Sequence, residues 1–391
     1  MNVNYKSTLY ACYLGYITQA LIVNLPPLLF VVFKEKFGLS YTMLGNLVVV
    51  IFITQLVVDA LAIRYVDKIG HRVSAVFAHI FAAVGMIALA VLPNLLPQPY
   101  IGLVIASLLF AIGGGLIEVL ISPIVESLPG DAKASSMSLL HSFYSWGQAL
   151  VIIFSTVALF FVGQDLWFIL PLLWAILPIF TSLKFAKVPL VPPQEEHKRT
   201  PLKTLMASKI FLIALILMVC SGAAEQAMGQ WSSIFVEKGL GISKMLGDLL
   251  GPCLFAIMMG IVRTFYGVKG QKIDVQNILI VSSLLCILSF VITALVPVPV
   301  VSLLGCALCG LAVSLMWPGM LSLMAEGYPS GGTALFAMMA LGGDLGCSVG
   351  PWLTGIVADA HNLNTGLLTG IIFPAIMLIG LLVLKAMLKT K

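Results

Sequence analysis

Carboxylate, imidazole and amide side chains interrupt an otherwise apolar stretch between residues 113 and 148. On a helix, Glu118 would share one face with small and polar residues spaced four positions apart, namely Gly114, Ser122 and Glu126. The next apolar segment repeats this arrangement at i, i+3, i+7 and i+10 with Ser138, His141, Ser145 and Gln148. An ionised side chain at a bilayer centre costs about 2.5–3.5 kcal/mol. In a membrane, both faces should therefore line a protein interior or a water-filled path.

A second intramembrane carboxylate, Glu225, occurs in the run SGAAEQAMGQWSSIF. Two amides, Gln226 and Gln230, lie beside its helical face. Trp231 could offer an apolar surface to a sugar ring or could lie at an interface. Because burial disfavours the charged form of a carboxylate, Glu118 or Glu225 could exchange protons near neutral pH. The alternative for each is a hydrogen-bonded structural glutamate, and His141 could equally be a contact between helices or a substrate ligand.

A third acidic residue, Asp344, lies in the run LGGDLGCSVGP. Three glycines at i+4 spacing in this run, Gly342, Gly346 and Gly350, predict a ridge that allows another helix to approach closely. Asp344 is then either a structural partner within the helix bundle or a transport residue.

The amino-acid composition indicates an integral membrane protein, whose helices would place these polar groups within the bilayer. Of the 391 residues, 60% are hydrophobic and 9% charged, and the mean hydropathy is +1.09. Soluble domains average about 25% charged residues. The apolar runs have the length of transmembrane helices. All seven cysteines fall in these runs, so we expect no disulfide framework, metal site or cofactor, although Cys306 and Cys309 form a CxxC pair.

Twelve transmembrane spans are predicted, and the distribution of basic residues predicts their orientation. The spans are 9–33, 43–63, 73–93, 100–128, 137–161, 167–185, 209–236, 245–267, 276–296, 299–324, 333–357 and 366–387. With both termini on one side, that side receives 17 of the 21 basic residues, Arg263 among them, and the opposite side receives Lys34, Lys36, Lys238 and Lys244. The positive-inside rule then places both termini in the cytoplasm.

The two halves of the chain resemble each other at a shift of 195 residues. This shift places Gly115, Leu116 and Pro123 on Gly310, Leu311 and Pro318, and Gly147 on Gly342. Glu118 and His141 have no ionisable counterparts, since Val313 and Phe336 stand there. A parallel repeat of six helices is typical of one transporter architecture. We expect two pseudo-symmetric bundles, 1–185 and 209–391, joined by a cytoplasmic linker at 186–208.

Charged residues cluster around Gly70 in the loop after the second span, IRYVDKIGHR, with Asp59 one or two turns before it. The cluster could form ion pairs of a cytoplasmic gate or could serve only to fix the topology. The candidate gate residues are Asp59, Arg64, Asp67, Lys68 and Arg72, together with Glu126 from the fourth span. This loop resembles the signature of the major facilitator superfamily, in which an Asp-basic-x-Gly-basic-basic run follows a glycine. Ile63 replaces that glycine. The resemblance implies an all-α integral membrane fold of twelve helices in two bundles.

A finer resemblance is to the fucose:proton symporter group and related sugar transporters. It rests on the glutamate before Ser122-Pro123 and on the runs LLHSFYSWG at 139–147, AEQAMGQW at 224–231 and GGTALFAMMALGGDLG at 331–346. The resemblance implies that Glu118 is the proton-coupled carboxylate. Members of the group carry an aspartate in the first span, where this chain offers only the amides Gln19 and Asn24.

The predicted function is proton-coupled uptake of a small polar solute, with a sugar favoured, by alternating access. Glu118 and Glu225 are the candidate proton-coupling residues. The candidate substrate-binding residues are Gln19, Asn24, His141, Tyr144, Gln148, Gln226, Gln230, Trp231, Trp317 and Asp344. The partners expected are a small-molecule substrate, protons and the lipid of the cell membrane, with no nucleic acid, and the chain is expected to act as a monomer.

Two alternatives come from other classes. The first is a proton antiporter that exports drugs or metabolites, which 17 methionines and an apolar interior would suit. The second is a receptor or a membrane-embedded enzyme. The sequence contains no HExxH, GxSxG or P-loop motif and no sizeable extramembrane domain, so the prediction is that the protein is not an enzyme.

Overall fold

The computed structural model describes residues 5–39, 41–129, 133–191, 200–236, 241, 244–269 and 274–389, and this part of the chain contains helices and no strands. The chain folds into two compact units. Unit 1 comprises Met1–Pro129 and Leu150–Pro193, and unit 2 comprises Gly130–Ala149 and Gln194–Lys391.

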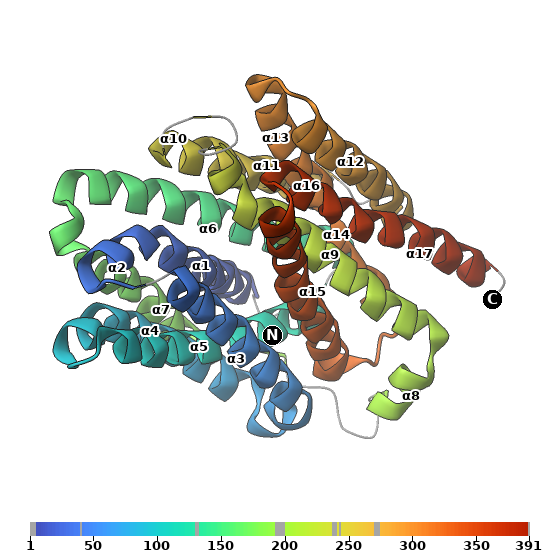
Figure 1. Ribbon diagram of the computed structural model, residues 1–391. Helices are drawn as coiled ribbons and strands as arrows, with labels where there is room; N and C mark the ends of the chain where they lie inside the picture. Colours follow the sequence, from blue (N-terminus) through green and yellow to red (C-terminus); the bar gives the residue numbers. More distant parts are fainter. Residues whose placement is uncertain are drawn as a thin grey trace. The chain divides into compact units, whose positions relative to one another are not determined.

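The helices of unit 1 are joined by short connections (Figure 1). They are α1 (Lys6–Leu28), α2 (Phe30–Phe37), α3 (Tyr41–Ile69), α4 (His71–Leu95), α5 (Pro99–Ser127), the second half of α6 (Lys133–Val162), the short η1 (Gln164–Leu166) and α7 (Ile169–Lys187). Within the unit, α5 packs against α1, α3 and α4, so it is the central helix on which Glu118 lies.

Unit 2 contains the first half of α6 and the remaining helices. They are α8 (Leu202–Ala207), α9 (Lys209–Ile234), α10 (Lys244–Asp248), η4 (Leu249–Cys253), α11 (Leu254–Lys269), α12 (Val275–Leu295), α13 (Pro299–Val313), α14 (Met316–Gly327), α15 (Gly332–Ala360), α16 (Leu363–Leu368), η6 (Thr369–Ile371) and α17 (Ile372–Lys389). The predicted N-terminal bundle, residues 1–185, includes all of α6. The two units divide the chain differently over residues 130–149, and the expected bundle boundaries stay a prediction.

Eleven helical stretches of the described chain are long and apolar enough to cross a membrane. They correspond to eleven of the twelve predicted spans. The remaining span, predicted at 43–63, lies in α3, where a shorter apolar stretch covers Asn46–Ala62. The chain is therefore a multi-pass membrane protein. The predicted linker at 186–208 contains the end of α7 and the short helix α8, while its residues 192–199 lie outside the described chain.

A glycine ridge on α15 packs against α9, as the GxxxGxxxG pattern predicted. A Cβ on Gly342 would lie 3.3 Å from the Leu215 carbonyl oxygen. One on Gly346 would lie 2.0 Å from the Val219 oxygen, and one on Gly350 would lie 2.4 Å from the Ala223 oxygen. Each contact advances four residues on both helices, so α9 and α15 run parallel with their backbones in direct contact.

Pro318 breaks the tenth span, whereas its repeat partner Pro123 does not break α5. Proline has no N–H to donate to the carbonyl four residues earlier. In unit 2, α13 ends at Val313 and α14 begins at Met316, so the carbonyl oxygen of Ser314 is released from the helix ladder. This released acceptor becomes part of the polar network described below.

Gly70 connects α3 to α4 with φ +93° and ψ 142°. Only glycine adopts this backbone region without strain, which explains the glycine in the loop signature. We expect Gly70→Ala to lower stability by about 1–3 kcal/mol, measured as a lower Tm of the purified protein in detergent. Gly327→Ala is the control, because a Cβ on Gly327 would meet nothing within 4 Å. Equal Tm values for the two variants would contradict the expectation.

Candidate functional site

The first polar cluster lies in unit 1, where α1 faces α5. Gln19 Nε2 donates a hydrogen bond of 3.0 Å to Glu118 Oε2. One turn away, the hydroxyls of Tyr16 and Ser122 share a hydrogen bond of 2.8 Å. Gln19 is buried and Glu118 is partly buried. Two residues that the sequence assigned independently to coupling and substrate binding are therefore in direct contact.

A third amide reaches this cluster from α3. Gln55, only 1% exposed, places its Nε2 2.4 Å from the point where a Cβ on Gly114 would lie. Gln19 Oε1 lies 3.0 Å from the same point. Gly114, the first member of the predicted polar stripe, thus makes room for amides from two other helices. Sequence reasoning missed Gln55, although a glutamine inside the apolar run IFITQLVV was a signal comparable to Gln19.

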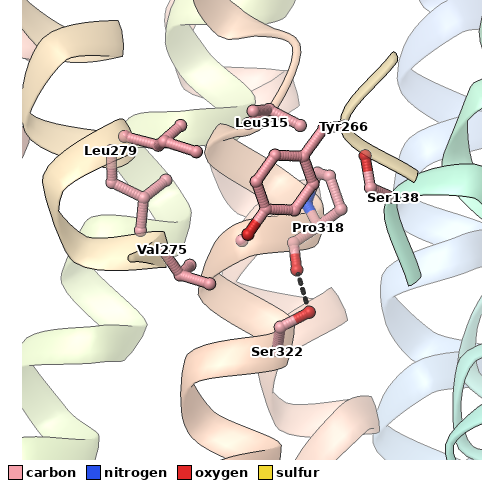
Figure 2. A pocket seen from close by; sticks show the side chains of 9 residues that line it. Ser138, Tyr266, Val275, Leu279, Leu315, Pro318 and Ser322 are labelled. Atoms are coloured by element: carbon pink, nitrogen blue, oxygen red, sulfur yellow. Dashed lines mark hydrogen bonds between the residues drawn. The ribbon is translucent and has the colours of Figure 1, made fainter. Parts of the chain in front are cut away.

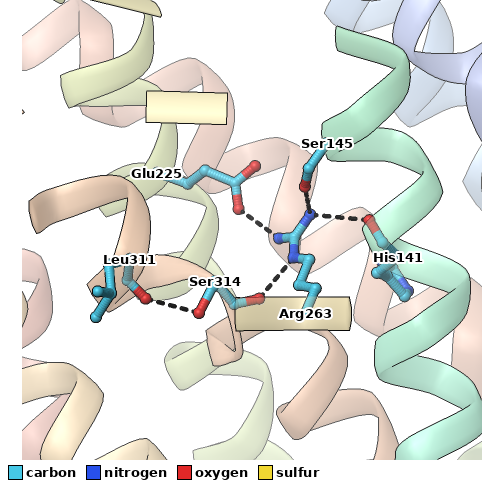
Figure 3. A network of polar contacts seen from close by, with 6 residues as sticks. All are labelled: His141, Ser145, Glu225, Arg263, Leu311 and Ser314. Carbon is cyan, nitrogen blue, oxygen red and sulfur yellow. Dashed lines mark hydrogen bonds and ion pairs between the residues drawn. The ribbon is translucent and has the colours of Figure 1, made fainter. Parts of the chain in front are cut away.

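The second polar cluster lies in unit 2 and is centred on Arg263 of α11 (Figure 3). Its guanidinium Nη2 lies 3.2 Å from Glu225 Oε2 on α9, forming a buried ion pair. Nε donates to the Ser314 carbonyl oxygen at 2.6 Å. Nη1 donates to Ser145 Oγ at 2.9 Å and to the His141 carbonyl oxygen at 3.3 Å. Arg263 thus binds α6, α9 and the break between α13 and α14.

The Arg263 network follows from local features of the sequence. Pro318 leaves the Ser314 carbonyl oxygen without its helical donor, and Arg263 supplies one. Arg263 is 1% exposed and Glu225 is 7% exposed, so neither charge is solvated by bulk water. A buried charge is tolerated when it is paired and hydrogen-bonded, as here. Glu225 and Arg263 therefore form a buried ion pair that carries no net charge.

Arg263 was counted only as one of the basic residues on the cytoplasmic side, and its place in a buried network was not predicted. The structure buries this side chain inside a membrane-spanning stretch, Met245–Lys269. The signal for its role was its position after the apolar run LFAIMMGIV. An arginine there needs a buried carboxylate, and Glu225 was already a candidate.

Several predicted substrate ligands hydrogen-bond within the protein. Asn24 donates to the Ala20 carbonyl oxygen of its own helix at 2.8 Å, and Gln230 donates to Gln226 Oε1 at 3.3 Å. His141 enters the Arg263 network through its backbone oxygen. Gln148 and Asp344 are buried, and Tyr144 is partly buried.

Three tryptophans of unit 2 each pack on a glycine. Trp231 lies against Gly355 and donates its indole N–H to the Pro351 carbonyl oxygen at 3.1 Å. The Trp317 ring covers Gly343. Trp146 covers Gly260 and donates to Thr264 Oγ1 at 2.9 Å. Two of these residues, Trp231 and Trp317, were predicted to stack on substrate, and in this structure their rings pack against α15.

The candidate gate residues lie at or near one end of unit 1. Asp67 Oδ1 lies 3.4 Å from His71 Nε2 across Gly70. Arg72 donates through Nη1 to the carbonyl oxygens of Phe185 and Ala186, at 3.1 and 2.7 Å, where it caps the C-terminal end of α7. The other predicted members vary in exposure: Asp59 is buried, Glu126 is partly buried, and Arg64 and Lys68 are exposed.

A small pocket in unit 2 has space for about one water-sized group (Figure 2). It is lined mainly by apolar side chains between α6, α11, α12 and α14, with Ser138, Tyr266 and Ser322 as polar members. Ser138 belongs to the polar face predicted on α6, but none of the candidate coupling, substrate or gate residues lines this pocket. Among the described residues, no cluster of His, Cys, Asp or Glu side chains could hold a metal ion. The seven cysteines are buried as free thiols.

Apolar membrane-spanning helices with buried polar clusters in their interior are the architecture of a solute transporter. The sequence matches the Major Facilitator Superfamily over residues 12–351. This chain belongs to that superfamily, and the predicted twelve-helix fold is consistent with it. The family indicates a transporter rather than an enzyme.

Solved structures of the same fold cover nearly the whole chain. The fucose:proton symporter FucP of E. coli is 14% identical with a TM-score of 0.77, covering 97% of this chain and 99% of its own. The proton:xylose symporter XylE, bound to 6-bromo-6-deoxy-D-glucose, is 14% identical with a TM-score of 0.82, covering 96% and 94%. The human organic anion transporter MFSD10 is 15% identical with a TM-score of 0.73, covering 97% and 99%. No curated protein matches the chain by sequence.

Proposed function

We propose that this protein takes up a small polar solute, with a sugar as the favoured case, by coupling its entry to protons. The observation that carries the proposal is the hydrogen bond between Gln19 and Glu118. It places a carboxylate that can exchange a proton beside an amide that can bind a hydroxyl group, on adjacent helices of one unit. Two sugar symporters share the fold, which supports the same class of substrate.

Glu118 is the stronger candidate for proton coupling, and Glu225 serves a different role. The Arg263 guanidinium lies 3.2 Å from Glu225, so protonating Glu225 would remove the partner of a buried cation. Glu118 instead bonds to a neutral amide donor. Protonating Glu118 would therefore leave the Arg263 ion pair intact. In this proposal Glu225 orders the unit 2 site, to which the other predicted ligands contribute.

We also propose that both termini lie in the cytoplasm and that the protein is inserted in the cell membrane. The distribution of basic residues supports cytoplasmic termini and insertion in the cell membrane. If Arg263 is left out of the count because it is buried in the helix bundle, 16 basic residues remain on the terminal side against four opposite, so the asymmetry is retained. The chain acts as a monomer, and the residues around Gly70 with Asp59 and Glu126 form the cytoplasmic gate.

The test is accumulation of labelled fucose, xylose and glucose in proteoliposomes with an inward proton gradient. A symporter carrying one proton per sugar concentrates its sugar up to about tenfold for each pH unit. We expect Glu118→Gln to reduce the accumulation ratio to about 1, because an amide cannot carry the proton. The variant should still exchange labelled for unlabelled sugar, because Gln19 retains a polar partner.

The control is Glu326→Gln, an exposed carboxylate near the end of α14, which should accumulate sugar as the wild type does. Undiminished accumulation by Glu118→Gln would remove Glu118 from the coupling site. If no sugar enters and a lipophilic cation is expelled instead, proton-coupled efflux replaces uptake as the function.

A further inference from the structure

Two buried amide groups beside Glu118 have opposite hydrogen-bonding needs. Gln55 Nε2, a donor, and Gln19 Oε1, an acceptor, have no hydrogen-bond partner among the described residues. Gln55 is 1% exposed and Gln19 is 4% exposed, so bulk water does not satisfy them. Both atoms lie within 3.0 Å of one point, the position of a Cβ on Gly114. A donor and an acceptor are thus held side by side.

The chemistry of this pair selects the kind of group that can satisfy it. A hydroxyl group can donate to Gln19 Oε1 and accept from Gln55 Nε2 at the same time. A carboxylate offers only acceptors and an ammonium offers only donors, so each would leave one amide group unpaired. Burying an unpaired polar group costs free energy. Such a pair should therefore discriminate strongly between a solute that has the hydroxyl group and one that lacks it.

We infer that Gln55 and Gln19 together recognise one hydroxyl group of the substrate, next to Glu118. The inference rests on the proposed function and narrows its substrate class to solutes that carry a hydroxyl group. Gln19 has two roles, because its Nε2 holds Glu118 and its Oε1 faces the hydroxyl. Gln55 is the specificity-determining residue that the α3 helix contributes.

Gly114 makes the arrangement possible, because it has no side chain where the Gln55 amide lies. In Gly114→Ala the new methyl group would be 2.4 Å from Gln55 Nε2 and 3.0 Å from Gln19 Oε1, so the Gln55 amide would have to move from its present position. Gly327→Ala in unit 2 is the control for the change from glycine to alanine. A Cβ there would meet nothing within 4 Å, whereas a Cβ on Gly115, next to Gly114, would lie 3.1 Å from the backbone oxygen of Gln55 itself.

The experiment measures binding to the purified wild type of fucose, xylose and glucose, and then of the monodeoxy analogues of whichever sugar binds. Loss of the recognised hydroxyl should weaken binding by the wild type about 5- to 150-fold. In Gln55→Leu and Gln55→Met, which cannot donate to the hydroxyl, the penalty for the same analogue should fall several-fold, because only the hydrogen bond to Gln19 Oε1 remains. Gly114→Ala should show the same reduction in discrimination, and Gly327→Ala should keep the wild-type preference.

Failure of the inference can be distinguished from failure of the proposed function. If sugars bind but every Gln55 variant retains the wild-type preference at all hydroxyl positions, the Gln55 inference is wrong while the proposed function stands. If the wild type binds no sugar, the proposed substrate class fails and the inference fails with it. Gln55→Met is included because methionine is close in length to glutamine, which gives a second test if Gln55→Leu does not fold.

Discussion

Arg263→Met should strongly reduce the amount of folded protein, and adding Glu225→Gln to it should restore much of the loss. Breaking a buried ion pair by removing one partner costs about 3–5 kcal/mol, because the other charge stays buried without compensation. A typical domain is stable by about 5–15 kcal/mol in total. When both members of the pair are uncharged, that penalty disappears. Restoration should be partial, because the Ser314 carbonyl oxygen and Ser145 Oγ still lose their donor.

Thermal unfolding in detergent and the monodisperse fraction after size exclusion measure this effect. Lys269→Met is the control, since Lys269 is an exposed cation on the same helix, near the Phe265 ring. It should unfold close to the wild-type Tm. The account of the network would be wrong if the double variant were less stable than Arg263→Met alone.

Alanine substitutions along the α15 ridge should destabilise the protein in an order set by distance. Gly346→Ala should cost most, because its methyl group would lie 2.0 Å from the Val219 carbonyl oxygen, which belongs to the helix backbone and cannot rotate away. Gly350→Ala follows at 2.4 Å, and Gly342→Ala at 3.3 Å should be mild. Overpacking a core typically costs about 1–3 kcal/mol, and at Gly346 the cost should reach or exceed that range, since α9 and α15 must separate.

The order of the three Tm values is the measurement, and the three variants serve as controls for one another. All of them raise helix propensity by the same change from glycine to alanine, so propensity alone predicts equal stabilisation. A Tm for Gly342→Ala as low as that for Gly346→Ala would contradict the close contact between the backbones.

The sequence predicted those parts of the structure that depend on periodic spacing. Helix-length apolar runs predict membrane spans, and glycines at i+4 predict a close helix contact, so both are local properties. The hydrogen bond between Gln19 and Glu118 joins residues 99 positions apart, and the sequence suggested only that each belonged to a polar site. Their contact required knowing that α1 packs against α5.

The residues that sequence reasoning missed depend on partners far along the chain. Arg263 resembles a loop cation near the end of an apolar run, until Glu225 and the Ser314 carbonyl oxygen are seen around it. The role of Gln55 becomes apparent only from its contact with Gly114, which lies on another helix. The packing of the predicted stacking residues Trp231 and Trp317 was missed for the same reason, because spacing on one helix does not indicate which helix will cover a ring.

The three tryptophan and glycine contacts give unit 2 built-in optical reporters. Each indole ring lies on a backbone surface of a different helix pair: Trp146 on Gly260, Trp231 on Gly355 and Trp317 on Gly343. Indole emission depends on how polar and how rigid its surroundings are, so separation of a helix pair would alter the signal of its own tryptophan. Keeping one of these tryptophans at a time, with the chain's other tryptophans replaced, would turn intrinsic fluorescence into a label-free record of which helices part during transport.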